Sequence, residues 1–440
     1  MARELSATTL AEADIVDLAH DGRGIARIDG KAVFVEGALP GERVRLRIIK
    51  RRRQLDDAVL VDILAASPDR VVPACAHFGV CGGCSLQHLS GAAQLAAKER
   101  QLLDNLQRIG RVIPERVLAP LRGPQWAYRR RARLGVKYVH KKARVLAGFR
   151  EREKPYIADI RRCEILPRAL GNLPRDLAAL IGTLEIREKL PQVELAAGDE
   201  ASALVFRLLQ PPGAEDVAKI SEFGASQGVQ IFLQSGGLET VRPLRGDYPP
   251  LRYSVDDGAV VIEFGPVDFI QINREINVAM VAAAVQLLEP TPEDTLLDLF
   301  CGLGNFTLPL ARRAKRVVGV EGDAALVAKA RANAAANGIG NAAFFRENLF
   351  EPAAFGAWAN EGYDLALLDP PRAGASALLA RMADWRPRRV VYISCHPGSL
   401  ARDAGALVFE QGYKLICAGV MDMFAHTSHV ESIAVFERLA

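Results

Sequence analysis

Hydrophobic and polar positions alternate along the first part of the chain. Residues 44–49 read VRLRII, a strict period of two. Turn-forming pairs interrupt the pattern: Asp-Gly at 21–22, Asp-Gly at 29–30 and Pro-Gly at 40–41. A period of two is typical of strands with one buried face, and such pairs are typical of hairpin turns. The sequence therefore predicts a small antiparallel β-barrel, placed in a domain of residues 1–67.

The middle of the chain predicts a β-rich domain over residues 68–266. Residues 94–110 have helical periodicity and end at a glycine, which predicts a helix. We expect that the segment of about 94–126 can pack with the C-terminal domain of residues 267–440. Strand-like runs such as RARLGVKYV (131–139) and SALVFRLLQ (202–210) then alternate with turns rich in glycine and proline.

After Pro290 the pattern changes to short buried runs separated by helical stretches. The runs are LLDLF (296–300), RVVGVE (316–321), YDLALLDPP (363–371) and RRVVYISC (388–395). Strands that alternate with helices predict a parallel sheet covered on both faces. We therefore expect an α/β domain of the doubly wound, Rossmann-like class over residues 267–440, with its ligands at the carboxyl ends of the strands.

Composition narrows the class of protein. No run approaches the roughly 18 apolar residues of a membrane span, and the first ten residues do not have the pattern of a signal peptide. Seven cysteines, an odd number, fit a reducing compartment better than a disulfide framework. These features predict a cytoplasmic protein that does not engage a membrane.

The net charge of +4 conceals an asymmetry. Residues 1–170 carry 32 Lys and Arg against 19 Asp and Glu, whereas the remainder carries 24 against 33. Basic clusters at 50–53, 129–133 and 137–144 include or adjoin Trp126, Tyr128 and Tyr138. Basic side chains pair with phosphates and aromatic rings stack on exposed bases, so we expect a single-stranded RNA partner. Any one cluster alone would more often be a solvated surface.

Four cysteines have the spacing of metal ligands. Cys75, Cys81 and Cys84 form a C-x5-C-x2-C pattern in CAHFGVCGGC, and Cys163 follows at a distance. The two glycines at 82 and 83 allow close wrapping of the backbone, and four thiolates suit either zinc or a four-cysteine iron–sulfur cluster. A radical S-adenosylmethionine cluster would need a C-x3-C-x2-C pattern with three ligands, so that class is disfavoured.

A nucleoside site is predicted where DLFCGLGNF (298–306) leads from a strand into a helix. Gly302 and Gly304 would let a ligand approach the backbone, and Glu321 at the end of the next strand could bind ribose hydroxyls. An NAD site would have a third glycine where Thr307 stands. S-adenosylmethionine, which lacks a pyrophosphate, fits this turn better.

Two further strand ends carry reactive groups. DPPR (369–372) projects Asp369 into the expected site, and Cys395 lies at the tip of the next strand, where a thiol can add to carbon 6 of a uracil. Cys301 and Cys417 are weaker candidates for this nucleophile. Glu431, at the start of the last strand, is the candidate base for the carbon-5 proton, with His426 and His429 as second choices.

Five motifs in this order resemble the RNA uracil-C5 methyltransferases. They are FIQIN (269–273), DLFCGLGNFTLPLA (298–311), DPPRAG (369–374), ISCHP (393–397) and HVESIAVF (429–436). With the four cysteines and a barrel that looks like a TRAM domain, the chain is most similar to the subgroup that acts on 23S rRNA. The family commonly reads S-C-N-P at the nucleophile, whereas this chain has His396 there.

The resemblance implies a class I methyltransferase domain, an OB-like TRAM barrel and a middle domain with an iron–sulfur site. It implies that S-adenosylmethionine and the uracil are bound by Gln271, Phe300, Asn305, Glu321, Asn348 and Asp369, beside the glycines at 302 and 304. Cys395 would be the nucleophile and Glu431 the carbon-5 base. Cys75, Cys81, Cys84 and Cys163 would hold a structural 4Fe-4S cluster.

The implied partner is 23S rRNA, bound as a single-stranded loop whose target uridine flips out of its stack. We expect the chain to act as a monomer without an obligate protein partner. Two alternatives stay open at the level of sequence. One is carbon-5 methylation of another rRNA or tRNA uridine, and the other is a non-catalytic iron–sulfur RNA-binding or assembly factor.

Overall fold

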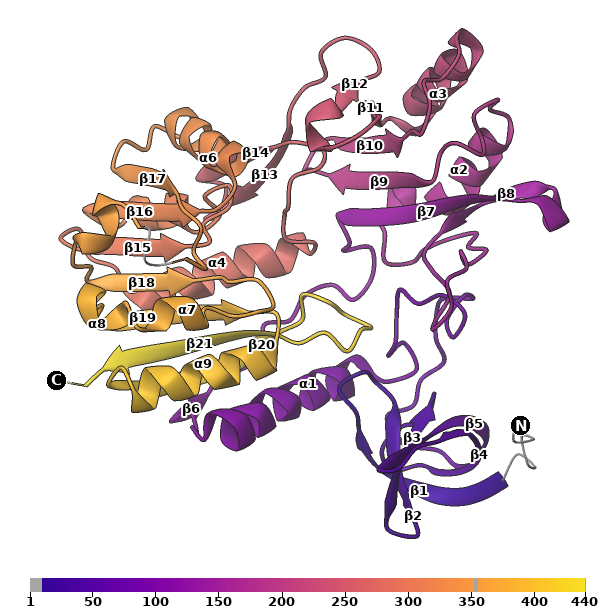
Figure 1. Cartoon of the computed structure of the whole chain (residues 1–440), viewed down its shortest axis with the longest axis horizontal. Coiled ribbons are helices and arrows are strands. Elements are labelled where there is room, and N and C mark those ends of the chain that lie inside the picture. The colour runs from indigo at the N-terminus through magenta and orange to yellow at the C-terminus, as the bar shows by residue number, and fades with distance from the viewer. Residues whose placement is uncertain (1–9, 352–354, 440) are drawn as a thin grey trace. The chain divides into compact units, whose positions relative to one another are not determined.

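The computed structural model describes residues 10–351 and 355–439. The chain divides into two compact units. Within the described residues, the first unit comprises the chain up to Lys98 together with Arg150–Pro155 and Ala425–His429. The second comprises Glu99–Phe149, Tyr156–Phe424 and the chain from Val430 onward. Each unit is built around its own sheets (Figure 1).

In the first unit the strands close into a barrel of order β1-β2-β3-β5-β4. The strands are β1 Leu10–Leu18, β2 Gly24–Ile28, β3 Lys31–Glu36, β4 Arg43–Arg51 and β5 Leu55–Ala65. Alternate side chains such as Val33 and Val35 on β3, and Val44 and Leu46 on β4, fill the interior because successive residues of a strand point to opposite faces. The predicted barrel is confirmed, but it is not wholly antiparallel, because β3 pairs parallel with β5.

The second unit contains a sheet of order β12-β11-β10-β9-β7-β8, which confirms the β-rich middle of the chain. Its strands are β7 Arg131–Val139, β8 Arg144–Gly148, β9 Gln192–Ala197, β10 Ser202–Arg207, β11 Gln230–Gln234 and β12 Arg242–Pro243. Two helices that the sequence analysis did not predict, α2 Leu173–Gly182 and α3 Ala214–Gln227, lie between them in the chain. A separate hairpin pairs β13 Leu251–Val255 with β14 Val260–Phe264.

A larger sheet in the same unit has the order β17-β16-β15-β18-β19-β21-β20-β6. Its strands are β6 Arg116–Val117, β15 Thr295–Leu299, β16 Arg316–Glu321, β17 Ala342–Arg346, β18 Leu365–Leu368, β19 Arg389–Ser394, β20 Tyr413–Met421 and β21 Glu431–Arg438. The strands β15 to β19 run parallel, whereas β21 pairs antiparallel with β19 and β20. The predicted α/β domain is confirmed.

Helices cover this sheet, as the salmon to yellow part of Figure 1 shows. They are α4 Arg274–Leu288, α5 Thr307–Ala311, α6 Ala324–Ala336, α7 Ser376–Leu379, α8 Met382–Trp385 and α9 Pro397–Phe409. Consecutive residues of β18 and β19 are buried, so both faces of the central strands are covered. No helix among the described residues is long and apolar enough to cross a membrane.

The helix predicted over 94–110 is divided in two. Helix α1 spans Gly91–Asn105, and a π-helical turn, η1, continues over Leu106–Gly110. Within the second unit, Gly110 approaches α9 so closely that a Cβ there would lie 2.4 Å from the Ala401 carbonyl oxygen. Beyond it, β6 adds a parallel strand to β20. The sequence analysis did not predict β6 because two residues are too few to show a period.

Candidate active site

Three side chains predicted to react come together at the carboxyl edge of the larger sheet. Asp369 directly follows β18, and Cys395 directly follows β19. Ser394 pairs with Ser432 across the antiparallel strands β19 and β21. The residue after Ser394 and the residue before Ser432 therefore lie opposite each other, and these are Cys395 and Glu431. Although Glu431 begins its strand, the reversed direction of β21 brings it to this edge.

The electrostatics of this group follow from burial. Burial raises the pKa of Asp369 to about 7. Burial, with a contribution from the Asp369 charge, raises the pKa of Glu431 well above its usual value. Burial, together with the nearby Glu431 and Asp369 charges, raises the pKa of Cys395 to about 11, and Arg372 acts in the opposite direction. Burial therefore disfavours the charged form of each of these three groups.

The other two thiols of the second unit considered as nucleophiles are inaccessible. Cys301 is 3% exposed and Cys417 is 1% exposed, whereas Cys395 is only half-buried. A Cβ on Gly319 would lie 3.0 Å from Cys301 Sγ, so this thiol fills the space against the neighbouring strand. Burial raises the pKa of Cys301 well above its usual value. These thiols lack the accessibility that a nucleophile requires.

The glycine turn after β15 has the backbone that its sequence predicts. Gly302 and Gly304 have φ values of 54° and 92°, which is the left-handed region that favours glycine. The amide of Gly302 donates to Glu321 Oε2 at 3.2 Å, and that of Asp323 donates to Glu321 Oε1 at 3.0 Å. Each carboxylate oxygen keeps capacity for another donor, so Glu321 can still accept hydroxyl groups.

Asp298, on β15 just before the glycine turn, is a candidate site residue that the sequence analysis did not name. It is fully buried, and Thr307 Oγ1 donates to its Oδ2 at 2.5 Å, while Oδ1 has no hydrogen-bond partner among the described residues. Burial is the main reason that its pKa rises to about 7. A buried acceptor without a donor is costly unless a ligand supplies one. Its position just before the glycine turn is the feature of the sequence that could have pointed to it.

The remaining predicted residues lie along the same edge or next to it. Phe300 has a φ of 65°, and its ring lies 5.9 Å from that of Phe350. Asn348, after β17, accepts from the Phe350 amide at 3.1 Å. Gln271 lies in the segment that precedes α4 and is half-buried. Asn305 lies in the glycine turn, where its amide contacts two other side chains that are described below.

His396 caps the helix that follows the nucleophile. Its Nδ1 accepts from the amide of Ser399 at 3.1 Å, which satisfies one of the free donors at the start of α9. Ser399 Oγ donates to the carbonyl of Arg372 at 2.6 Å. The cap therefore connects the turn of Cys395 with the turn of Asp369. An asparagine, which the resemblance leads us to expect at this position, could accept the same amide proton.

A sequence model of the tRNA (uracil-5-)-methyltransferase family matches residues 91–356, which is more than half of the chain. The chain belongs to the tRNA (uracil-5-)-methyltransferase family. A model of the TRAM domain matches residues 10–61, which form the barrel. The predicted membership of the RNA uracil-C5 methyltransferases is therefore confirmed, and the alternative of a chain outside the enzyme class is disfavoured.

Relatives within this uracil-5-methyltransferase family match over almost the whole chain. A Methylococcus capsulatus protein named 23S rRNA (uracil(1939)-C(5))-methyltransferase RlmD is 53% identical, over 97% of this chain and 96% of the relative. A Stenotrophomonas maltophilia protein of the same name is 51% identical, over 97% of both.

A solved structure shares the fold. The crystal structure of Pyrococcus abyssi tRNA (uracil-54, C5)-methyltransferase in complex with S-adenosyl-L-homocysteine has a TM-score of 0.73. It is 24% identical, and the likeness covers 97% of this chain and all of that one.

The predicted metal ligands fall in both units. In the first unit Cys75, Cys81 and Cys84 are half-buried, and the amide of Gly83 donates to Cys81 Sγ at 3.4 Å. Cys163 is buried in the second unit. Among the described residues, no group of three or more His, Cys, Asp or Glu side chains is arranged to hold a metal ion. The cluster stays a prediction.

The second choices for the base, His426 and His429, belong to the first unit. There the His426 amide donates to Gln94 Oε1 at 2.8 Å. This contact involves the backbone of His426 and gives no support to a role for its ring as a base.

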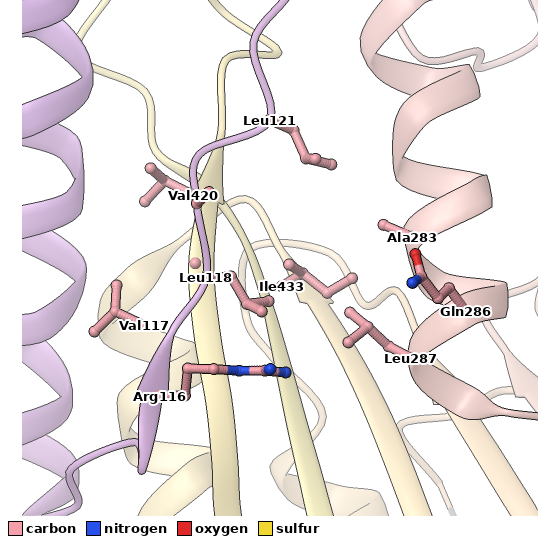
Figure 2. Close-up of a pocket in the computed structure, with 11 residues that line it drawn as sticks. Arg116, Val117, Leu118, Leu121, Ala283, Gln286, Leu287, Val420 and Ile433 are labelled. Atoms are coloured by element: carbon pink, nitrogen blue, oxygen red, sulfur yellow. The ribbon is translucent and has the colours of Figure 1, made fainter.

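A cavity of about 400 Å³ lies elsewhere in the second unit. Figure 2 shows that Arg116, beside β20, and Gln286, on α4, extend toward it from opposite sides. Its wall is otherwise largely aliphatic, with Leu118, Leu121, Leu287, Val420 and Ile433 among the lining residues. None of the predicted site residues, all of which lie in the described part of the chain, lines it.

Proposed function

We propose that this enzyme transfers a methyl group from S-adenosylmethionine to carbon 5 of uridine 1939 of 23S rRNA. The target and the donor are inferred from the named relatives, which match over nearly the full length. The observation that carries the chemistry is the grouping of Cys395, Asp369 and Glu431 at one edge of the sheet. A thiol next to two buried carboxyls suits addition to a pyrimidine followed by removal of a proton.

Cys395 is proposed to act as the nucleophile. The thiol would first give its proton to a base, and the resulting thiolate would add to carbon 6 of the uracil, so that carbon 5 gains the electron density needed to accept a methyl group. Because the pKa of the thiol is raised to about 11, a base or a cation must favour the thiolate when the RNA binds. Arg372 is the cation whose charge lowers this pKa.

Glu431 is proposed to complete the reaction. After carbon 5 has been methylated, the Glu431 carboxylate would take the remaining proton from carbon 5, and the bond between Cys395 Sγ and carbon 6 would break. The raised pKa of Glu431 makes its carboxylate a stronger proton acceptor than an exposed glutamate. Asp369, buried beside both groups, would hydrogen-bond the uracil in its protonated form.

S-adenosylmethionine, when bound, supplies the electrophilic methyl group. Gln271, Phe300, Asn305, Glu321, Asn348 and Asp369 are proposed to line its pocket and that of the uracil, with Gly302 and Gly304 allowing a close approach. Two observations fit such a ligand. A Cβ on Gly302 would have open space around it, and Asp298 Oδ1 is a buried acceptor that could accept a hydrogen bond from a cationic amine.

The RNA would be bound as a single-stranded loop with the target uridine flipped toward Cys395. The positive balance of residues 1–170 and the TRAM match to the barrel support this partner. We further propose that the chain works as a monomer in the cytoplasm, and that its domains divide near residues 67 and 266.

Cys75, Cys81, Cys84 and Cys163 are proposed to hold a structural 4Fe-4S cluster. Thiolates suit such a cluster, and the donation from the Gly83 amide to Cys81 Sγ is typical of cysteines that ligate iron. Cys84→Ser should remove iron and the visible absorption of anaerobically purified protein. Cys417→Ser, a buried thiol outside the motif, should leave both unchanged, and iron retained in Cys84→Ser would contradict the assignment.

The test is mass spectrometry of nucleosides and fragments from unmodified 23S rRNA incubated with the enzyme and S-adenosylmethionine. We expect one 5-methyluridine at position 1939, absent with Cys395→Ala. Methylation of tRNA alone would retain the chemistry and overturn the substrate. No methylation of either RNA would favour the assembly-factor alternative.

A further inference from the structure

The side chain of Asn305 is held by two buried polar residues from other elements. Asn305 and Asn277 form a reciprocal amide pair, in which each Nδ2 donates to the other residue's Oδ1 at 3.0 Å. The hydroxyl of Tyr253 donates to Asn305 Oδ1 at 3.1 Å. Asn277 lies on α4 and Tyr253 on β13, so this three-residue network joins the glycine turn to both elements.

The network uses most of the hydrogen-bonding capacity of the Asn305 amide. Asn305 Oδ1 accepts two hydrogen bonds, which uses its full capacity. Asn305 Nδ2 donates one of its two protons to Asn277. One amide proton therefore remains for a ligand, and the orientation of the amide is fixed by the two partners. Without them the amide could rotate and present its oxygen instead.

The partners are themselves firmly placed. Tyr253 is 6% exposed and Asn277 is 4% exposed. The Tyr253 ring packs against Phe264, with the ring centres 5.8 Å apart. The next residue, Ser254, donates through its backbone amide and its hydroxyl to Asp199 Oδ2, each at 3.0 Å. The strand that carries Tyr253 is therefore anchored on the side away from Asn305.

We propose that Tyr253 and Asn277 are positioning residues for the methyl donor. They hold the Asn305 amide so that it offers a proton, and not an oxygen, to the nucleoside cofactor. This inference rests on the proposed function. A positioning role explains why two polar side chains are buried next to the glycine turn. The glycines of this turn have positive φ values and would otherwise allow several conformations.

The first test compares two tyrosine-to-phenylalanine variants by calorimetric binding of S-adenosylhomocysteine to the full-length protein. Tyr253→Phe should weaken binding about fivefold, which corresponds to about 1 kcal/mol. The matched control is Tyr413→Phe, which also removes one buried hydroxyl, donated there at 2.8 Å to the Pro387 carbonyl. The control should bind as the parent does, even if its melting temperature falls.

A kinetic comparison separates positioning from a general loss of structure. For Tyr253→Phe we expect the KM for the donor to rise while kcat at saturating donor stays near that of the parent. We also expect the rate of Cys395 addition to RNA that contains 5-fluorouridine, measured without donor, to stay unchanged. A fall in kcat and in adduct rate with unchanged donor affinity would overturn the proposal.

A double-mutant cycle tests whether Tyr253 acts through Asn305. The effects of Tyr253→Phe and Asn305→Ala on donor affinity should be strongly non-additive, because the second change removes the group that the first one orients. Additive effects would contradict the proposal. A parent protein that binds no S-adenosylhomocysteine would overturn the proposed donor and this inference together, whereas normal binding by both the parent and Tyr253→Phe would overturn the inference alone.

Discussion

Buried carboxyl groups adjoin the Cys395 thiol, and their charges oppose its ionisation. The protonated thiol is therefore favoured over the thiolate. In the proposed mechanism the bound uracil has to shift this equilibrium toward the thiolate. The same burial suits Glu431 to the proposed role of base, because a carboxyl with a raised pKa accepts a proton readily once it has been ionised. The two effects come from one cause, the closed environment of the sheet edge.

Glu431→Gln should separate addition from release. Glutamine has the shape of glutamate but cannot take the carbon-5 proton, so methylated RNA should stay attached to Cys395 and migrate with the protein on a denaturing gel. Glu437→Gln is the matched control on the same strand, since Glu437 pairs with Arg389 away from the site. Normal turnover by Glu431→Gln would exclude it as the base.

Asp369→Asn should stabilise the folded protein at alkaline pH. The folded pKa of about 7 lies above the ordinary value of 3.8, so the folded state binds more protons between these values and stability falls as pH rises through that window. Each pKa unit corresponds to about 1.4 kcal/mol. The variant should therefore gain stability over the parent from pH 4 to pH 8, measured by urea unfolding. A constant difference across this range would contradict the shift.

His396→Ala should destabilise the turn at the start of α9. Loss of an N-cap acceptor typically costs about 1 kcal/mol, whereas His396→Asn keeps an acceptor and should cost much less. Urea unfolding of the three proteins checks this order. If the alanine and asparagine variants were equally stable, the contact between Nδ1 and the Ser399 amide would contribute little.

Elements with strong local patterns were predictable from the sequence. The barrel, β7, β16 and the parallel core have regular periods or unbroken apolar runs, and their positions agree with the prediction. Helices α2 and α3 were missed because they lie between strand-like runs in a stretch rich in glycine and proline. The strand β6 was missed because only its partner β20 makes it a strand.

Site residues followed a similar rule. Those in dense motifs, such as Cys395 in ISCHP, could be named from the chain alone, and the structure groups Cys395 with Asp369 and Glu431. Asp298 and the pair of Tyr253 and Asn277 could not be found in this way. Their importance depends on burial and on partners distant in sequence, which no local pattern records.

For the whole molecule, the separation of charge between the two parts of the sequence predicts salt-sensitive binding of RNA. The affinity for a 23S rRNA fragment should fall steeply as salt rises, because bound cations are released from the phosphates. Lys50→Glu, in the basic cluster of residues 50–53, should weaken binding and flatten this dependence. Lys315→Glu, at an exposed position in the acidic part of the sequence after residue 170, should have a smaller effect. Equal effects of the two variants would show that the asymmetry does not direct binding.

The most direct test of the account is to locate the covalent bond that catalysis requires. The enzyme would be incubated with S-adenosylmethionine and a 23S rRNA fragment that contains 5-fluorouridine, whose carbon-5 fluorine cannot leave as a proton does. After digestion, mass spectrometry of the crosslinked peptide should find a methylated fluorouridine on Cys395 and none in Cys395→Ala. An adduct on another residue, or methylation of natural RNA by Cys395→Ala, would contradict the account.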